Sequence, residues 1–256
     1  MVIFDSIERW LKITWDRYKE LEKVPISVRD AFLVQEYLTV THIQELTKKK
    51  ETIKVLDLAC GTGRIAESII KASFCKIELT LADLNKNTLD KAKQYLQAYN
   101  SINYIPLDAY KLGDDFQNKF DVIICMDFFH HMSDLSSLMK QINIALNPNG
   151  ILIANAFDKK YYKKFDRIKY GFVKSFKRSF LSMLAKGIYR HVSPNIQEII
   201  REKGWAGIEP LTKIEVNNYL SPYFFDIKFE KSFYLWFSAS KSLMCTEATT
   251  SQGEAK

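Results

Sequence analysis

The chain has 256 residues, of which 47% are hydrophobic and 26% are charged. This balance excludes wholesale disorder and collagen-like repeats, and the length suits one α/β domain with an appendage. The net charge of +7 arises from one basic segment, and the rest of the chain is nearly neutral.

The cellular setting is inferred from what the sequence lacks. No stretch approaches the roughly 18 apolar residues that a membrane-spanning helix needs. Asp5 and Glu8 stand where a secretion signal would carry basic residues. The four cysteines contain no CxxC pair, which argues against a disulfide framework and a zinc site: Cys60, Cys75, Cys125 and Cys245. We therefore expect a reducing, cytoplasmic setting and no bound metal.

Residues 1–47 are expected to form an N-terminal helical cap. Trp10, Trp15 and Tyr18 recur with other apolar residues at three- and four-residue spacings, so one side of a first helix is aromatic. Pro25 ends that helix, and the pattern predicts a second helix over Val28–Leu46. The aromatic side could lie over a ligand as a lid, although core packing is the commoner role of such a stripe.

From residue 48 the pattern alternates between strands and helices. It predicts strands over 53–58, 77–83, 102–107, 120–126, 151–157, 225–229 and 233–239, and helices around 65–70, 89–96, 135–146 and 214–220. An Asn-Pro-Asn-Gly turn is expected at 147–150. The last two strands are joined by so short a link that they must be antiparallel. We expect a Rossmann-like, doubly wound α/β sheet of seven strands, with the last strand antiparallel, from residues 48–157 and 207–241.

Residues 158–206 interrupt this domain as a basic, aromatic helical insert. The segment from Asp158 to Arg190 contains eleven basic and two acidic residues, which gives it a charge of +9. The rest of the chain therefore carries a net charge of −2. Apolar side chains recur there every four residues: Phe172, Phe176, Phe180 and Leu184. Four roles are consistent with this insert: a lid over a lipophilic or aromatic substrate, a docking face for an acidic carrier protein, a membrane-surface anchor, or simply a solvated helical face. Of the functional roles, we prefer the lid. The small, polar tail 242–256 is expected to be disordered.

Acidic and glycine residues gather where the predicted strands end. Asp57 and a glycine turn at 61–63 close the first strand, where backbone can approach a ligand and a helix begins with unpaired N–H groups. Asp83 ends the second strand 20 residues after that turn, where a carboxylate can accept hydrogen bonds from ribose hydroxyls. Asp108 ends the third strand and suits an adenine amine, and Asp127 ends the fourth. Each alone fits an ordinary turn or cap; together they predict a nucleotide-like ligand.

This set of motifs resembles the class I S-adenosylmethionine-dependent methyltransferases of the small-molecule type. VLDLACGTGR resembles their first motif, LADLN the second, PLDAY the third, FDVIICMDFFHHMSD their fourth strand and LNPNGILIANAF their fifth. The resemblance implies S-adenosylmethionine as cofactor, S-adenosylhomocysteine as product, and a set of cofactor-binding residues: Asp57, Ala59, Gly61, Gly63, Asp83, Leu84, Asp108, Ala109, Asp127 and Phe128. Trp15 of the aromatic helix is a further candidate for contact with the cofactor. Ala59 departs from the pattern by replacing its first glycine, and we expect it to be tolerated only with a negative φ.

The resemblance implies methyl transfer by in-line attack. The acceptor is expected to be an oxygen or nitrogen atom, and less readily a carbon, of a small, lipophilic or aromatic metabolite, as in natural-product biosynthesis. His131 and His130 follow the fourth strand, where the family places its substrate, and each is a candidate base or substrate-orienting group. For each histidine alone, capping a helix or packing is the plainer interpretation.

Three alternatives stay open. An RNA methyltransferase could grip phosphates with the insert, but the sequence has no separate RNA-binding module and a near-neutral body. A cofactor-binding protein without turnover needs only the binding motifs. The spacing of Gly61, Gly63 and Ala66 also fits a dinucleotide-dependent dehydrogenase. Such an enzyme would not need Asp57, and this sequence contains no recognisable residues for hydride transfer. The sequence does not indicate an oligomeric state.

Overall fold

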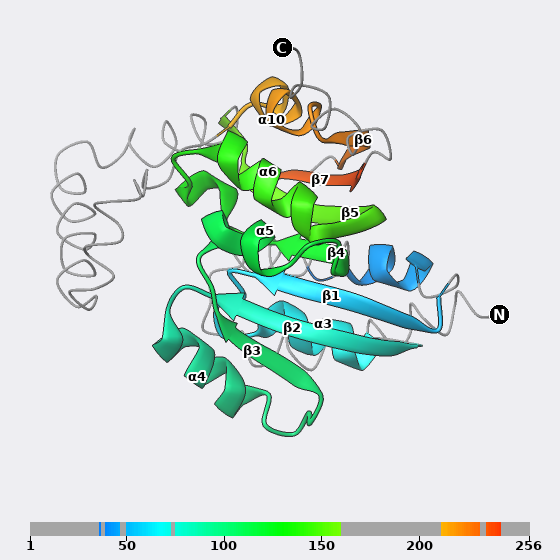
Figure 1. Ribbon diagram of the computed structural model, residues 1–256, viewed down its shortest axis with the longest axis vertical. Helices are drawn as coiled ribbons and strands as arrows, with labels where there is room; N and C mark the ends of the chain where they lie inside the picture. The colour runs from blue at the N-terminus through cyan, green and yellow to red at the C-terminus, as the bar shows by residue number, and fades with distance from the viewer. Residues whose placement is uncertain are drawn as a thin grey trace, which may run out of the picture.

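The computed structural model describes residues 36, 39–46, 50–72, 75–159, 211–230 and 234–241. Its centre is a seven-stranded sheet in the order β3-β2-β1-β4-β5-β7-β6 (Figure 1). The strands are β1 Thr52–Leu58, β2 Lys76–Asp83, β3 Ile102–Pro106, β4 Phe120–Cys125, β5 Leu146–Phe157, β6 Phe224–Glu230 and β7 Tyr234–Lys241. The helices are α3 Arg64–Ala72, α4 Lys86–Tyr95, α5 Leu112–Asp115, α6 Leu135–Ala145 and α10 Lys213–Leu220, with short 3₁₀ turns η1 Ala109–Lys111 and η2 Phe129–His131.

The strand directions confirm the expected fold class. The strands β1 to β5 are parallel, whereas β7 runs antiparallel to both β5 and β6. The chain starts in the middle of the sheet, moves outward through β2 to β3, and then crosses to β4 on the other side of β1. In such sheets ligands bind outside the carboxyl ends of the strands, where the strand order reverses. Here that point lies between β1 and β4.

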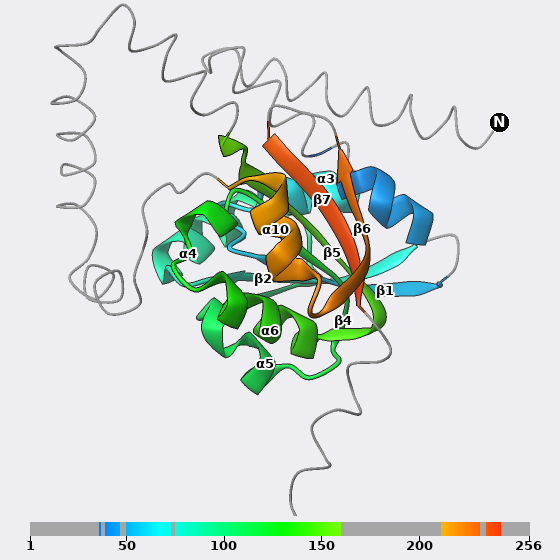
Figure 2. The ribbon, with the colours of Figure 1, turned by 90° about the horizontal axis from the view of Figure 1, so that it is seen from above.

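The sheet is buried on both faces because its central strands are apolar on both. In β1, Ile53 and Val55 belong to a core cluster shared with α3 and α4, and Leu56 and Leu58 to a second cluster shared with α6 and α10. Neighbouring side chains of a strand point to opposite faces, which explains this division. Figures 1 and 2 show α5 and α6 together on one side of the sheet and α3 on the other.

The start of β5 differs from the sequence prediction. The residues expected to form a turn at 147–150 belong to β5, which begins at Leu146. Leu146 pairs with Phe120 of β4, and the register shifts before Val122 pairs with Ile151. Asn149 has a φ of +63°, so these residues form a bulged beginning of the strand.

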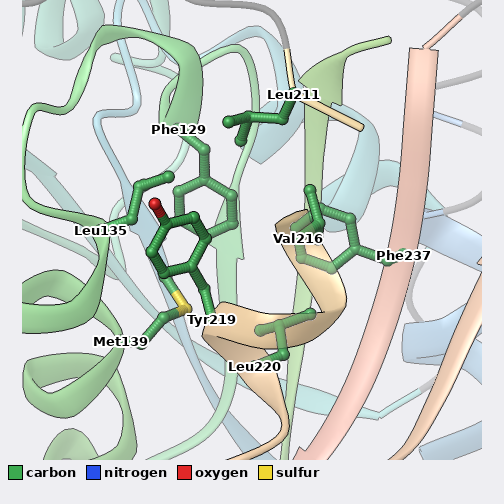
Figure 3. A pocket seen from close by; sticks show the side chains of 8 residues that line it. All are labelled: Phe129, Leu135, Met139, Leu211, Val216, Tyr219, Leu220 and Phe237. Atoms are coloured by element: carbon green, nitrogen blue, oxygen red, sulfur yellow. The ribbon is translucent and has the colours of Figure 1, made fainter. Parts of the chain in front are cut away.

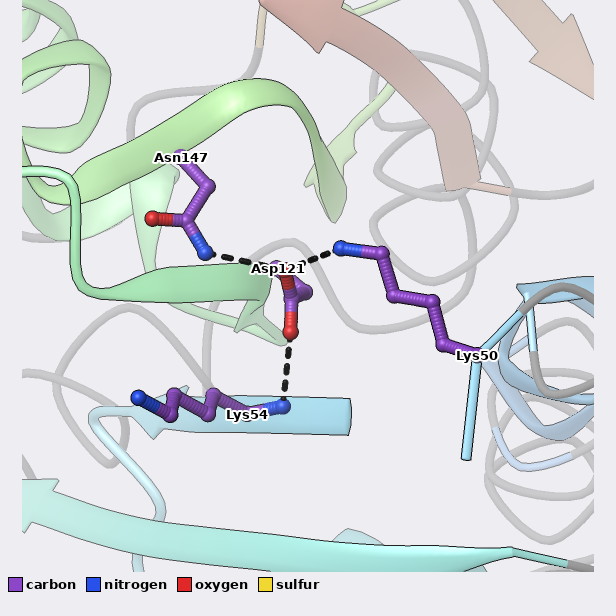
Figure 4. Close-up of polar contacts among 4 residues, drawn as sticks. All are labelled: Lys50, Lys54, Asp121 and Asn147. Atoms are coloured by element: carbon purple, nitrogen blue, oxygen red, sulfur yellow. Dashed lines mark hydrogen bonds and ion pairs between the residues drawn. The ribbon is translucent and has the colours of Figure 1, made fainter. Parts of the chain in front are cut away.

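Asp121 joins three strands at the amino edge of the sheet (Figure 4). Its carboxylate accepts hydrogen bonds from Nζ of Lys50 at 2.6 Å, the backbone N–H of Lys54 at 2.9 Å and Nδ2 of Asn147 at 2.9 Å. Burial raises the pKa of Asp121, but these hydrogen bonds and the charge of Lys50 together bring it below its ordinary value. The interaction therefore ties β1, β4 and the bulged start of β5 together.

Most residues of the predicted cap, insert and tail lie outside the described part of the chain. Of the cap, the structure describes residue 36 and residues 39–46, which are helical as expected. Of the insert it describes residues 158 and 159, and of the tail none. The short helical segments η1, α5 and η2 were not predicted. None of the described helices combines the length and apolarity that crossing a lipid bilayer requires.

Candidate functional site

The predicted acidic residues converge at one edge of the sheet. Asp57 is the second-last residue of β1, and Asp83 is the last residue of β2. Pro106 of β3 pairs with Asp83, which places Asp108 just beyond the same edge. Asp127 follows the end of β4 by two residues. Since these strands are parallel, all four positions lie at their carboxyl ends, where the topology predicts a ligand.

The loop between β1 and α3 adopts left-handed backbone at three positions. The φ angles are +60° at Ala59, +56° at Gly61 and +82° at Gly63. Our expectation of a negative φ at Ala59 is therefore wrong. A β-carbon in this conformation costs about 1–2 kcal/mol. The loop offsets this strain with backbone hydrogen bonds from Cys60 to Ala82 and from Gly63 to Cys60, both 3.0 Å long.

The two glycines of this loop serve different purposes. A β-carbon at Gly63 would lie 2.7 Å from Cδ1 of Leu96, so this glycine permits the close packing of the loop against the end of α4. A β-carbon at Gly61 would have no atom within 4 Å. The backbone at Gly61 therefore borders open space into which a ligand can approach.

Asp83 links the glycine loop to the end of β2. Its Oδ2 accepts a hydrogen bond from the N–H of Gly61 at 3.1 Å, and its Oδ1 accepts one from Asn85 at 2.8 Å. Burial raises the pKa of Asp83, and these two hydrogen bonds oppose that rise. A carboxylate has about four acceptor positions, so Asp83 can also accept ligand hydroxyls. The next residue, Leu84, presents an apolar side chain that is 42% exposed.

Asp57 is a buried carboxylate with an unsatisfied oxygen. The residue is 2% exposed, and its Oδ2 has no hydrogen-bond partner among the described residues. Burial raises its pKa to about 7; the charge of Arg64 lowers the pKa, whereas Asp83 raises it further. A buried carboxylate of this kind is costly without a donor or a cation beside it. The site is therefore built to receive a positive or hydrogen-bond-donating group.

Asp108 and Ala109 shape the edge at β3. Oδ1 of Asp108 accepts a hydrogen bond from the N–H of Tyr110 at 3.1 Å and caps η1. The N–H of Leu107 donates to the carbonyl of Asp83 at 3.1 Å, which holds this strand end against β2. Ala109 is 7% exposed and belongs to the core, so its methyl group packs inward.

Asp127 turns the chain out of β4 in a strained conformation. Its φ is +54°, and its backbone N–H donates to Oδ1 of Asn155 at 2.6 Å. Nδ2 of Asn155 donates back to Oδ1 of Asp127 at 2.9 Å. The turn leads into η2, where the N–H of His131 donates to the carbonyl of Phe128 at 2.9 Å. Both Phe128 and His131 are half-buried.

The structure does not describe the side chains of two predicted site residues. Trp15 is not among the described residues, and the side chain of His130 is not described. Conversely, Asn155 and Glu36 contact residues of the site but were not predicted from the sequence. Asn155 carried a signal, because an amide side chain within the apolar run 151–157 is expected to be buried and then needs hydrogen-bond partners. No local sequence signal pointed to Glu36, because its partners Arg64 and Ser68 are about 30 residues away in the sequence.

Beside the site, an apolar pocket lies between η2, α6, α10 and β7 (Figure 3). Its lining is apolar apart from the hydroxyl of Tyr219: Phe129, Leu135, Met139, Leu211, Val216, Tyr219, Leu220 and Phe237. The cavity volume is about 10 Å³, near the minimum for one water molecule. The described residues alone therefore leave no room here for a metabolite. No group of three or more His, Cys, Asp or Glu residues within the described ranges could hold a metal ion.

The comparisons with known proteins agree with this geometry. Residues 56–152 match the methyltransferase domain family. A ubiquinone biosynthesis O-methyltransferase from Histophilus somni is 30% identical over 160 residues, which cover 61% of this chain and 63% of that protein. The chain spans between 45% and 65% of the length of the first curated relatives that it matches.

Solved structures resemble the fold over most of both chains. A protein from Pyrococcus horikoshii aligns with a TM-score of 0.59 at 20% identity, covering 86% of this chain and 94% of that one. The N-methyltransferase NodS from Bradyrhizobium japonicum, in complex with S-adenosyl-L-homocysteine, aligns with a TM-score of 0.53 at 11% identity, covering 87% and 90%. The comparisons support the resemblance seen in the sequence: residues 56–152 match a methyltransferase domain, curated relatives that align with about 60% of the chain are named O-methyltransferases, and the fold is shared with a solved N-methyltransferase.

Proposed function

We propose that this methyltransferase moves a methyl group from S-adenosylmethionine to an oxygen or nitrogen atom of a small, lipophilic or aromatic metabolite. The observation that carries the proposal is the convergence of buried Asp57, the loop at 59–63 and Asp83 at one edge of the sheet. Relatives named ubiquinone biosynthesis O-methyltransferases support oxygen as the acceptor atom.

The described residues fit S-adenosylmethionine. The unsatisfied Oδ2 of Asp57 suits the cationic methionine end, since a buried carboxylate is stabilised by a nearby positive charge. The open space at Gly61 lets a ligand reach the backbone. Asp83 retains acceptor positions for the ribose hydroxyls, and the exposed side chain of Leu84 offers an apolar contact for the adenine.

The residues of the chain chiefly bind and align in this proposal. S-adenosylmethionine supplies a methyl group activated by a positively charged sulfur. Fixing two reactants in line can contribute ~7–11 kcal/mol to lowering the barrier. His131, placed just after β4 by η2, is the candidate to accept a proton from the acceptor or to orient it, with His130 beside it in the sequence. Neither cysteine near Asp57 is a candidate nucleophile, because burial raises the pKa values of Cys60 and Cys125 and keeps both thiols neutral.

The insert is the proposed acceptor-side element. Asp158 and Leu211 form a parallel bridge, and the N–H of Lys159 donates to the carbonyl of Leu211 at 2.9 Å. The chain therefore leaves and re-enters the domain at one place, just beyond the carboxyl end of β5 and at the ligand edge. This anchoring supports a lid over a small-molecule substrate. Contact with an acidic carrier protein or a membrane surface is a further proposed role of its basic residues.

Calorimetry tests cofactor binding. Wild type should bind S-adenosylmethionine and S-adenosylhomocysteine but not nicotinamide dinucleotides. Asp83→Ala should weaken S-adenosylmethionine binding by about tenfold or more, because hydrogen bonds to a charged group are worth roughly 1.5–3 kcal/mol. Asp90→Ala, which removes an exposed carboxylate from α4, is the matched control and should bind normally. Unchanged affinity in Asp83→Ala would remove the ribose assignment.

Transfer of a labelled methyl group tests the reaction. Phenolic and amine-bearing metabolites should accept the label, and RNA should not. Binding to RNA that weakens steeply with added salt, together with methylation of RNA, would instead establish the alternative RNA methyltransferase. Tight cofactor binding with no transfer to either pool would favour the non-catalytic alternative.

A further inference from the structure

Glu36 is a buried acid bound to the helix that begins after the glycine loop. It is 1% exposed and precedes the residues that match the methyltransferase family. Its Oε1 accepts a hydrogen bond from Nη1 of Arg64 at 2.8 Å, and its Oε2 accepts one from Oγ of Ser68 at 2.8 Å. Arg64 is the first residue of α3, and Ser68 lies one turn further on. One carboxylate therefore clamps the first two turns of this helix.

This arrangement satisfies a charge that would otherwise be costly to bury. The side chain of Glu36 is 2% exposed, and that of Arg64 is 25% exposed. Taking a carboxylate out of water carries a large penalty, which is recovered only when good hydrogen bonds accompany the ion pair. A segment outside the matched domain is thus bound to the backbone element that positions Gly63.

Arg64 also acts on the other buried acid of the region. Its positive charge opposes the burial that raises the pKa of Asp57 to about 7, and Asp83 acts in the opposite direction to Arg64. Cys60 of the loop and Cys125 of β4 also interact electrostatically with Asp57, and burial keeps both thiols neutral. Arg64 therefore lies between two acids: Glu36 in direct contact, and Asp57 within electrostatic reach.

We propose that Glu36 is a positioning residue of the cofactor site. By binding Arg64 and Ser68 it holds the start of α3 behind the glycine loop, and it draws the charge of Arg64 away from Asp57. Asp57 then remains available to the cationic end of the cofactor. The functional part of this inference rests on the proposed function, whereas the charge coupling is a property of the protein without ligand.

A carboxyl ¹³C NMR titration of the free protein tests the coupling. Asp57→Asn identifies the Asp57 signal. Glu36→Gln keeps the shape of the side chain but removes its charge, so Arg64 should act more strongly on Asp57. The titration midpoint of Asp57 should fall by about half a pH unit or more. In an Arg64→Gln background, Glu36→Gln should have a much smaller effect, because the coupling passes through Arg64. An unchanged midpoint, or an equal shift in both backgrounds, would overturn the proposal.

Calorimetry then tests the effect on binding. Glu36→Gln should weaken S-adenosylmethionine binding several-fold at pH 8, Ser68→Ala should weaken it less, and the exposed Asp90→Asn should not change it. Urea unfolding checks that each variant is folded. If Glu36→Gln binds as well as wild type, Glu36 has no positioning role. If the wild type itself does not bind the cofactor, the proposed function fails, while the NMR titration still decides whether Glu36 controls the charge near Asp57.

Discussion

Asp127 and Asn155 form a reciprocal hydrogen-bonded pair across the carboxyl ends of β4 and β5. Asn155 is fully buried, and both ends of its amide bind Asp127. The side chain thus continues the interaction between the two strands beyond the last backbone pairing, Cys125 with Ala154. Asp127 can hold its positive φ because this pair constrains it. The pair thereby decides where the segment carrying Phe128 and His131 leaves the sheet.

Substituting Asn155 should destabilise this turn in a pH-dependent way. Asn155→Asp places a second carboxylate against Asp127, and two like charges in contact raise the pKa of the pair. Stability should be close to that of wild type at acidic pH and should fall as the pH rises through the raised pKa, because the folded state then loses the shared proton. Urea unfolding between pH 4 and 8 measures this. Asn155→Leu, which leaves the N–H of Asp127 unpaired, should cost about 1–3 kcal/mol with little pH dependence. A flat difference between the Asp variant and wild type would exclude the pairing.

Ala59→Gly should stabilise the protein. Alanine at a φ of +60° is strained, and glycine removes that strain although it increases the freedom of the unfolded chain. The expected net gain is about 1 kcal/mol by urea unfolding. Ala66→Gly, within α3 and fully buried, is the control and should lose roughly 0.5–1 kcal/mol or more. If Ala59→Gly is less stable than wild type, the left-handed conformation of Ala59 is not the one present in solution.

The hydrogen bonds of Asp121 to Lys50, Lys54 and Asn147 should increase the free energy of unfolding at neutral pH but not at strongly acidic pH. The folded pKa of Asp121 lies below its unfolded value of about 3.8, so its contribution is complete above that value and is lost as the pH falls through the folded pKa. Asp121→Ala should cost about 2 kcal/mol or more at pH 7, because three hydrogen bonds are lost. The difference between wild type and the variant should shrink below pH 4. Thermal unfolding at pH 3 and pH 7 distinguishes this from a pH-independent packing role.

His131→Ala should slow methyl transfer more than it weakens cofactor binding. The residue lies on η2, on the side of the site opposite Asp83, so removing its imidazole should spare the ribose contacts proposed for Asp83. We expect a loss of about 100-fold in kcat if it acts as a general base, with the dissociation constant of S-adenosylmethionine changed less than threefold. Single-turnover kinetics and calorimetry measure the two quantities. Equal rates in wild type and variant would leave His131 a structural role.

Much of the fold could be predicted because its signals are local. The short apolar run of β1 is typical of a buried strand, and the apolar stripe of α6 has the period of a helix that buries one face. The position of Asp83 at a strand end needed only the strand boundary and the rule for parallel sheets. The beginning of β5 could not be predicted in this way, because its bulge depends on Asp121, 26 residues away from Asn147.

The sequence by itself determined the seven strands and the longer helices of the described domain, their alternating order, and which acidic and glycine residues stand at the strand ends. Only the tertiary structure decided the left-handed backbone of Ala59, the pairing of Asn155 with Asp127 and the clamp of Glu36 on α3. These features depend on groups that are remote in the chain and meet only after the sheet has formed. Periodicity reports the burial of a single segment, whereas the partners of a buried polar group are set by the packing of several.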